Sequence, residues 1–496
     1  LRQITMVPPM AKSLSPCHKY EPLAHGSKAA KMSKPSPRPP LFIPGLALLA
    51  ALPSLAALLL YGTIETPDST GYIAYATQIR TLSLPTGQAL LHSAAGNISL
   101  FRMGGFPALL AALQIAFPSG WKLALALAQI VANSGVAVAC YFTARRLGIT
   151  RHYALAAALL PSIGFVVIMN LCILTDALYS AALAGAACAL VLRPDWRGAL
   201  LAGLLLAAGT TFREATIYLV LAFLPLALLT RRHLLCVLLV VLPVWGIAGA
   251  QIAWNMERGA GPVLTTVKQL VMVQALLPLI HDHVPVYADN PSFAAAAVHT
   301  IDLGGYARID AFEAALTSDG LTAPQIATEA SREYVMAWLH YPLRMAGATL
   351  GDFRKAYLFM PFQPLETIAT IQQYKTGIRP AFDLMNVQAQ ALRAGRPGAL
   401  LWIIAVEGCQ VIGTAIALIG LIAPWRIKGA WTLRALWCLP VGMAGLYMPV
   451  HLEPRYLAPV VPVICILAAA GASRWMPGGT RSYNAAATLS ITPSQL

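Results

Sequence analysis

Long apolar segments separated by short polar ones fill the chain from residue 41 to residue 475. Several of them are about 20 residues long, which is the length that a helix needs to cross about 30 Å of hydrocarbon. We therefore predict an all-α polytopic membrane protein with about ten transmembrane helices. The segments lie near residues 41–62, 121–143, 152–170, 173–192, 198–211, 214–230, 234–254, 399–424, 431–450 and 456–474.

Two longer segments of mixed character interrupt this pattern. Residues 63–120 contain charges, glycines and prolines, and within them 104–117 predicts a helix lying on the membrane surface. Residues 255–398 carry twelve of the twenty acidic residues, which is typical of a region in water. Surface helices or one embedded hairpin are expected at 334–360. The predicted organisation is a basic, disordered tail (1–40), an N-terminal transmembrane core (41–254), an outer-face region (255–398), C-terminal transmembrane helices (399–475) and a short tail (476–496).

Composition supports lipid as the solvent of this chain. Hydrophobic residues make up 57% and charged residues 11% of the sequence, whereas soluble domains carry about 25% charged residues. The formal net charge of +15 comes largely from the N-terminal tail and the short connections between apolar segments. We interpret these basic residues as topology signals and expect no nucleic-acid partner.

The basic connections predict the orientation of the helices. If the N-terminus is cytoplasmic, every short connection rich in arginine or lysine falls on the cytoplasmic side, as the positive-inside rule requires. Residues 63–120 and 255–398 then lie outside, and both termini lie in the cytoplasm, which fits a bacterial inner membrane. The basic residues concerned are Arg145, Arg146, Arg151, Arg193, Arg197, Arg231, Arg232, Arg426, Lys428, Arg434, Arg474 and Arg481.

Two further features carry little functional information. Most of the eight cysteines lie inside apolar segments and none forms a CxxC pair, so we expect buried thiols rather than a metal site or disulfides. Residues 1–40 lack the apolar core of a signal peptide. Met32 precedes a compact basic stretch, and we expect translation to start there.

The rare charges near apolar segments are more informative, because an ionisable side chain at the bilayer centre costs about 2.5–3.5 kcal/mol. In the predicted threading they all fall at the outer ends of the helices. Each also has a local explanation: Asp68 and Asp176 could cap helices, Arg213 could pair with Glu214, and Glu453 with Arg455. Their gathering at one face favours a reaction centre. The residues are Glu65, Asp68, Arg102, Asp176, Arg213, Glu214, His451, Glu453 and Arg455.

Five motifs around these charges resemble bacterial GT-C membrane glycosyltransferases, which include the lipid A aminoarabinose transferases and relatives of the protein O-mannosyltransferases. The motifs are TPDSTGYIAYATQIR (66–80), FRMGGFPALLAAL (101–113), ILTDALYSAAL (173–183), TFREA (211–215) and HLEPRYLAPVVPV (451–463). Their order agrees with the family from about residue 41 to 475. Two positions depart from it: Gly104 replaces a commoner proline, and Ser69 follows Asp68 where many relatives have a second acid.

The resemblance implies sugar transfer from a polyprenyl-phosphate donor to a lipid, glycan or protein acceptor, beside membrane lipid. Asp68 is the expected general base, and we expect Asp68→Asn to abolish transfer. Arginines suit the leaving phosphate through their planar fork of donors. Whether the protein needs a divalent cation as a cofactor stays open, because the sequence offers no clear pair of metal ligands. The expected phosphate ligands are Arg455, Arg213 and Arg102. Glu453 and Asp176 would orient the donor or contact sugar hydroxyls, and Tyr72 and Tyr456 would pack on the sugar or belong to the interfacial aromatic belt.

Two other functions remain compatible with the sequence. A transporter or lipid flippase would also have about ten spans and few charges, but its site usually lies near the midplane of the membrane. An oligosaccharide ligase or polymerase would differ only in using a diphosphate-linked donor.

Overall fold

The computed structural model describes residues 41–230, 232–300, 305–358, 371, 392–395, 397–450 and 454–475. The chain divides into two units, Leu1–Phe42 and Ile43–Leu496, and the second holds nearly all the described residues. These residues form helices and no β-strand, with one isolated bridge between Ile64 and Cys172. Both predicted tails, and Glu453 with its neighbours 451 and 452, lie outside the described part of the chain.

Five helical segments among the described residues are long and apolar enough to cross a membrane. Shorter apolar helices pack among them, and the prediction of an all-α polytopic membrane protein is confirmed; the count of about ten spans stays a prediction. The five are α1 (Phe42–Tyr61), α6 (Trp121–Arg146), α12 (His233–Glu257), α20 (Gly398–Arg426) and Arg455–Trp475, which ends in α23 (Val461–Trp475). The shorter ones are α9 (Asp176–Leu192), α10 (Trp196–Phe212), α11 (Thr216–Leu228) and α21 (Trp431–Tyr447).

The outward faces of the long helices are apolar. On α12, Leu234, Leu238, Leu242 and Trp245 are 72%, 51%, 59% and 54% exposed and follow one another at intervals of three or four residues. Residues at this spacing share one face of a helix. A soluble protein rarely exposes such a continuous apolar stripe, so this face of α12 is suited to contact with lipid.

The predicted segment 152–170 is not one helix. It forms α7 (Arg151–Leu159), the 3-10 turn η1 (Leu160–Ile163) and α8 (Val166–Leu171). Pro161 enters the first turn of η1, where its missing N–H costs no hydrogen bond, and Gly164 adopts a non-helical conformation. Hydropathy alone did not reveal this break, because apolar residues continue through it.

Two groups of shorter helices lie between the apolar ones. The first group comprises α2 (Pro67–Arg80), α3 (Gly87–His92), α4 (Ala94–Phe101) and α5 (Gly105–Ala116). The second comprises α13 (Lys268–His281), α14 (Pro291–Thr300), α15 (Gly305–Ser318), α16 (Ala323–His340) and α17 (Pro342–Leu358). The helix predicted at 104–117 is therefore present as α5, and helices also occupy 334–358.

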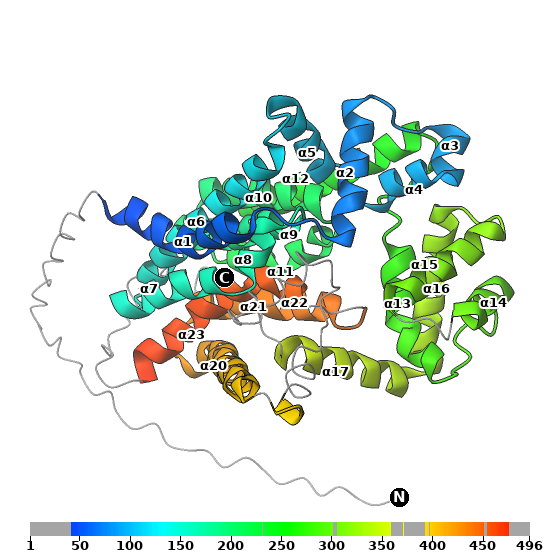
Figure 1. Ribbon diagram of the computed structural model, residues 1–496. Helices are drawn as coiled ribbons and strands as arrows, with labels where there is room; N and C mark the ends of the chain where they lie inside the picture. The colour runs from blue at the N-terminus through cyan, green and yellow to red at the C-terminus, as the bar shows by residue number, and fades with distance from the viewer. Residues whose placement is uncertain are drawn as a thin grey trace, which may run out of the picture. The chain divides into compact units, whose positions relative to one another are not determined.

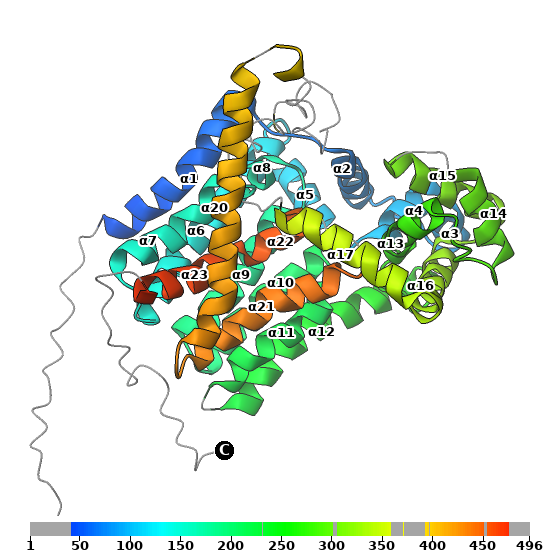
Figure 2. The same ribbon diagram turned by 90° about the horizontal axis from the view of Figure 1, so that it is seen from below.

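The two groups are joined by hydrogen bonds. Gln269 Nε2 of α13 donates to Asn97 Oδ1 of α4 over 3.3 Å, and in the segment before α13 the amide of Thr266 donates to the carbonyl of Leu100 over 2.9 Å. Figure 1 shows α13–α16 side by side, next to α3 and α4. From α16, α17 runs back toward α20 (Figure 2). Tyr287, Phe293 and Phe312 form the aromatic centre of the second group.

Candidate functional site

The site begins where α2 leaves α1. Thr66 is the N-cap of α2, and Ser69 Oγ accepts a hydrogen bond from the Thr66 amide over 2.9 Å. The helix starts at Pro67 with Thr66 as its N-cap, so the suggestion that Asp68 caps a helix is wrong. Asp68 instead lies in the first turn, where the helix dipole favours its negative charge.

Hydrogen bonds between two backbone segments hold the start of α2 against the start of α9. Ile64 exchanges hydrogen bonds with Leu171 and Ile173 over 2.9 and 3.1 Å, and Ser69 Oγ donates to the Ile173 carbonyl over 3.0 Å. Gln129 of α6, fully buried, donates to the Cys172 carbonyl over 3.1 Å. Since buried backbone groups are expensive to leave unpaired, these bonds hold the extended link before α9. The two acids that follow, Asp68 and Asp176, are thereby held by one frame.

Asp68 is bracketed by two arginines. Its Oδ1 accepts from Arg102 Nη2 over 3.1 Å, and its Oδ2 accepts from Arg455 Nη1 over 2.8 Å. Burial alone would raise the pKa of Asp68, but the charges of Arg102 and Arg455 outweigh it and lower this pKa well below its ordinary value. Arg102 also donates to the Tyr72 hydroxyl, and its guanidinium lies 4.4 Å from the centre of the Tyr72 ring.

Asp176 forms a second, more buried pair. It is the first residue of α9, with Thr175 as the N-cap, so it does not cap the helix. Its Oδ1 accepts from Arg213 Nη2 over 2.7 Å, and Arg213 Nε donates to Thr175 Oγ1 over 3.1 Å. The Asp176 side chain is 2% exposed and that of Arg213 is 14% exposed.

Tyr456 connects the two pairs. The guanidinium carbons of Arg213 and Arg455 lie 5.1 and 5.3 Å from the centre of its ring, and its ring stacks on Tyr447 at 4.7 Å. Cation–π contacts of this kind contribute about 0.5–2 kcal/mol each. Tyr456 and Tyr72, which were expected to pack on a sugar, thus contact the site arginines in this structure.

We call Asp68, Arg102, Asp176, Arg213 and Arg455 the charged cluster. Three arginines and two aspartates give it a formal charge of +1. Asp176 opens α9, Arg213 follows α10, and Arg455 belongs to α22 (Pro454–Leu457) just before α23. Their contacts show that these helix ends meet at one end of the bundle. Among the predicted site residues and the charges gathered with them, Glu453 and His451 lie outside the described part of the chain.

Sequence reasoning missed three residues that hold this arrangement. Thr175 binds Arg213, and Tyr447 stacks on Tyr456. Tyr334 of α16 donates its hydroxyl to the Pro449 carbonyl over 2.8 Å, close to the residues that precede Arg455. The order Thr-Asp before an apolar segment signals a helix start and could have drawn attention to Thr175. Nothing in the local sequence marks Tyr447 or Tyr334.

The described residues contain no group of three His, Cys, Asp or Glu side chains arranged to hold a metal ion. Asp68 and Asp176 each face guanidinium groups instead. The residues of the charged cluster therefore do not offer the oxygen ligands that a hard divalent cation requires.

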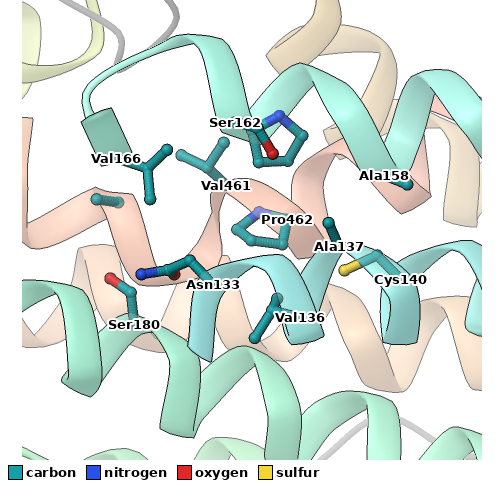
Figure 3. A pocket seen from close by; sticks show the side chains of 12 residues that line it. Asn133, Val136, Ala137, Cys140, Ala158, Ser162, Val166, Ser180, Val461 and Pro462 are labelled. Carbon is teal, nitrogen blue, oxygen red and sulfur yellow. The ribbon is translucent and has the colours of Figure 1, made fainter. Parts of the chain in front are cut away.

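A small cavity lies within the bundle near the charged cluster. Asn133, Ser162, Ser180 and Pro462 line it, together with apolar groups of α6, α7 and α23 (Figure 3). Ser180 is one turn beyond Asp176 on α9. The cavity holds about 30 Å³, which is room for one or two water molecules and far too little for a polyprenyl chain.

Comparison of the sequence with known protein families and with curated proteins finds no match. Among solved structures, the Archaeoglobus fulgidus oligosaccharyltransferase in its apo form has 13% identity, with a TM-score of 0.45, covering 88% of this chain and 50% of that one. Its form tethered with an acceptor peptide has 11% identity and a TM-score of 0.45, covering 88% and 49%. This chain spans about half the length of these proteins. The assignment of function therefore depends on the charged cluster itself.

Proposed function

We propose that this protein transfers a sugar from a polyprenyl-phosphate donor to a lipid, glycan or protein acceptor, at the non-cytoplasmic face of a bacterial inner membrane. The observation that carries the proposal is the convergence of Arg102, Arg213 and Arg455 at one end of an apolar helix bundle. Guanidinium groups bind phosphate through paired hydrogen bonds, and the phosphate of a membrane lipid lies at the interface, where we expect these helix ends to be.

The arginines would act on the leaving group. When the bond between the sugar and the phosphate breaks, negative charge collects on the phosphate oxygens. Preorganised cations at that point stabilise the transition state more than the ground state. Arg102 and Arg455 are held ready by Asp68, whose carboxylate occupies the place that a phosphate would take. We accordingly assign Asp68 the task of holding these arginines in position.

The location of the charged cluster favours surface chemistry over transport. All five residues lie at or just beyond helix ends, Arg102 at the 108° break between α4 and α5, whereas transport sites usually lie near the midplane of the membrane. We expect the acceptor to be recognised by the helices that precede α6 and those between α12 and α20.

Binding of unlabelled polyprenyl phosphate, the expected product, tests the proposal on the full-length protein in lipid nanodiscs. We expect Arg455→Gln to weaken binding about 10-fold or more, because a hydrogen bond to a charged group contributes about 1.5–3 kcal/mol. Arg197→Gln is the matched control, since Arg197 lies in the first turn of α10, at the opposite end of that helix from Arg213. Equal affinity in the Arg455→Gln and Arg197→Gln variants would contradict the proposal.

Transfer itself is tested with a panel of labelled polyprenyl-phosphate and polyprenyl-diphosphate sugars and an extract of envelope acceptors. We expect label to move only from a monophosphate donor. Turnover restricted to diphosphate donors would indicate a ligase or polymerase, and lipid movement across the bilayer without cleavage would indicate a flippase.

A further inference from the structure

A second group of positive charges lies at the start of α21, away from the charged cluster. Residues 427–430 connect α20 to α21 (Figure 2), and the basic residues around this connection are Arg426, Lys428 and Arg434. Residues 411–450 contain no aspartate or glutamate, and the three cations are absent from the ion pairs formed by the described residues. Their charge is therefore available to a bound anion.

The backbone of the connection adds to this positive potential. Gly429, with φ +70°, makes the turn between the two helices. Ala430 is the N-cap of α21 and has no side-chain acceptor, so the amides of the first turn are not capped by a side chain. The helix dipole places partial positive charge at this point. A helix N-terminus and three cations thus meet at one connection.

Two tryptophans hold Arg434 in place. Its guanidinium carbon lies 4.8 Å from the centre of the Trp431 ring and 5.5 Å from that of the Trp425 ring. Arg434 Nε donates to the Pro424 carbonyl over 3.3 Å, which fixes the guanidinium between α20 and α21. Trp425 in turn meets Trp437 edge to face, with ring centres 5.2 Å apart. A cation held in this way loses little conformational entropy when an anion binds.

The two indole rings lie beside an apolar stripe on the surface of α20. Trp425 and Trp431 are more than half exposed. Leu418 and Ile422 are also exposed, and with Trp425 they follow one another at intervals of three or four residues on one face of α20. Exposed tryptophans are typical of the level of lipid headgroups. The stripe is therefore suited to acyl chains, and the basic residues lie at its headgroup end.

We propose that the α20–α21 connection binds the headgroup phosphate of an anionic phospholipid, whose acyl chains lie along the Leu418–Trp425 face of α20. Arg434 donates to the phosphate through charge-assisted hydrogen bonds, and Arg426 and Lys428 complement the negative charge of the headgroup. The apolar stripe favours a lipid over free phosphate, and the lack of nearby acids favours an anionic headgroup over a zwitterionic one. This site does not depend on the proposed function.

The test uses the full-length protein in detergent micelles, with phosphatidylglycerol carrying a photoreactive headgroup as the probe. We expect crosslinks in residues 421–437, with competition by unlabelled phosphatidylglycerol but not by phosphatidylcholine or inorganic phosphate. Arg434→Gln should weaken phosphatidylglycerol binding about 10-fold, because a hydrogen bond to a charged group is lost. Arg197→Gln is the matched control and should leave binding unchanged: Arg197 also lies against a tryptophan, Trp196, but has the carboxylate of Asp195 beside it.

A second variant guards against a folding defect in Arg434→Gln. Lys428 is exposed and lies outside both helices, so Lys428→Gln removes one charge without breaking the turn. We expect about 5-fold weaker binding, as for the loss of one basic residue near an anionic lipid. Trp431→Leu should weaken binding about 3-fold by removing a cation–π contact.

Two results would overturn the inference. The first is wild-type phosphatidylglycerol affinity in both Arg434→Gln and Lys428→Gln. The second is competition by phosphatidylcholine or inorganic phosphate that equals competition by phosphatidylglycerol, since the site would then recognise acyl chains alone or any free anion.

Discussion

Asp68 and Asp176 both pair with arginine, yet their surroundings differ. The Asp176 and Arg213 side chains are 2% and 14% exposed, whereas Asp68 is 30% exposed and its partners Arg102 and Arg455 are 24% and 18% exposed. Removing one member of a buried pair leaves the other charge buried without a partner, while a partly exposed pair can exchange partners. We therefore predict that Asp176 with Arg213 acts as the frame of the site and that Asp68 with Arg102 and Arg455 is the part that exchanges partners with a ligand.

The largest effect should follow from breaking the frame. Asp176→Ala leaves Arg213 without its carboxylate, and we expect a loss of about 3–5 kcal/mol in the free energy of unfolding, the cost typical of a broken buried pair. Thermal and denaturant unfolding in detergent measure it. In the exposed pair Glu329–Arg332, Glu329→Ala should cost less than about 1 kcal/mol. Equal losses in the two variants would show that burial does not distinguish the pairs.

A smaller effect should appear as opposite pH dependences of Asp68 and Glu214. The pKa of Asp68 is lowered in the folded state, so its ionised form stabilises the fold above the ordinary value of 3.8, and this contribution disappears as the pH falls below it. The pKa of Glu214 is raised, so stability from this group falls as the pH rises above the ordinary value of 4.5.

At pH 7 we therefore expect Asp68→Asn to be less stable than the wild type, by about 1 kcal/mol, and Glu214→Gln to be more stable. The Glu214→Gln difference should shrink as the pH falls toward 4.5, and the Asp68→Asn difference should shrink only as the pH falls below 3.8. Unfolding temperatures measured from about pH 2 to pH 8 provide the comparison. The same sign for both variants would mean that the two carboxylates do not differ in the way described.

The smallest effect should come from the tyrosine beside Asp68. Tyr72→Phe removes the hydroxyl that accepts from Arg102 but keeps the ring beneath its guanidinium. We expect a loss of about 0.5 kcal/mol in stability, the low end of the range for a hydrogen bond, below the losses of Asp68→Asn and Asp176→Ala. Tyr218→Phe, at a tyrosine that is 52% exposed, is the control and should leave the unfolding temperature unchanged. A Tyr72→Phe loss matching that of Asp176→Ala would place Tyr72 in the frame.

The fold was largely predictable because hydropathy fixes which segments enter lipid. Each predicted apolar segment falls on helices, and the interruption at Pro161 was missed only because apolar residues continue through it. The arrangement of α13–α17 was not predictable, since those helices pack through tertiary contacts such as Phe293 with Phe312. Local sequence does not encode such partners.

The members of the site were also predictable, but their partners were not. Charged residues are rare in this chain, so Asp68, Asp176 and Arg455 stood out by their position beside apolar segments. The pairing of arginines with acids depends on two contacts. These are the backbone hydrogen bonds of Ile64 with Leu171 and Ile173 and the close approach of Gly105 to Thr211. Both join distant segments, and Glu214, which could have paired with Arg213, is absent from the ion pairs formed by the described residues.

The competition between Asp68 and phosphate for Arg455 provides the most direct test of the account. Polyprenyl-phosphate affinity should be measured for Asp68→Asn, Arg455→Gln and the double variant. We predict that Asp68→Asn binds more tightly than the wild type, by a coupling of about 0.5–3 kcal/mol with Arg455, and that this gain is lost when Arg455 is also replaced. Unchanged or weaker binding in Asp68→Asn, or an equal gain in both backgrounds, would contradict the account.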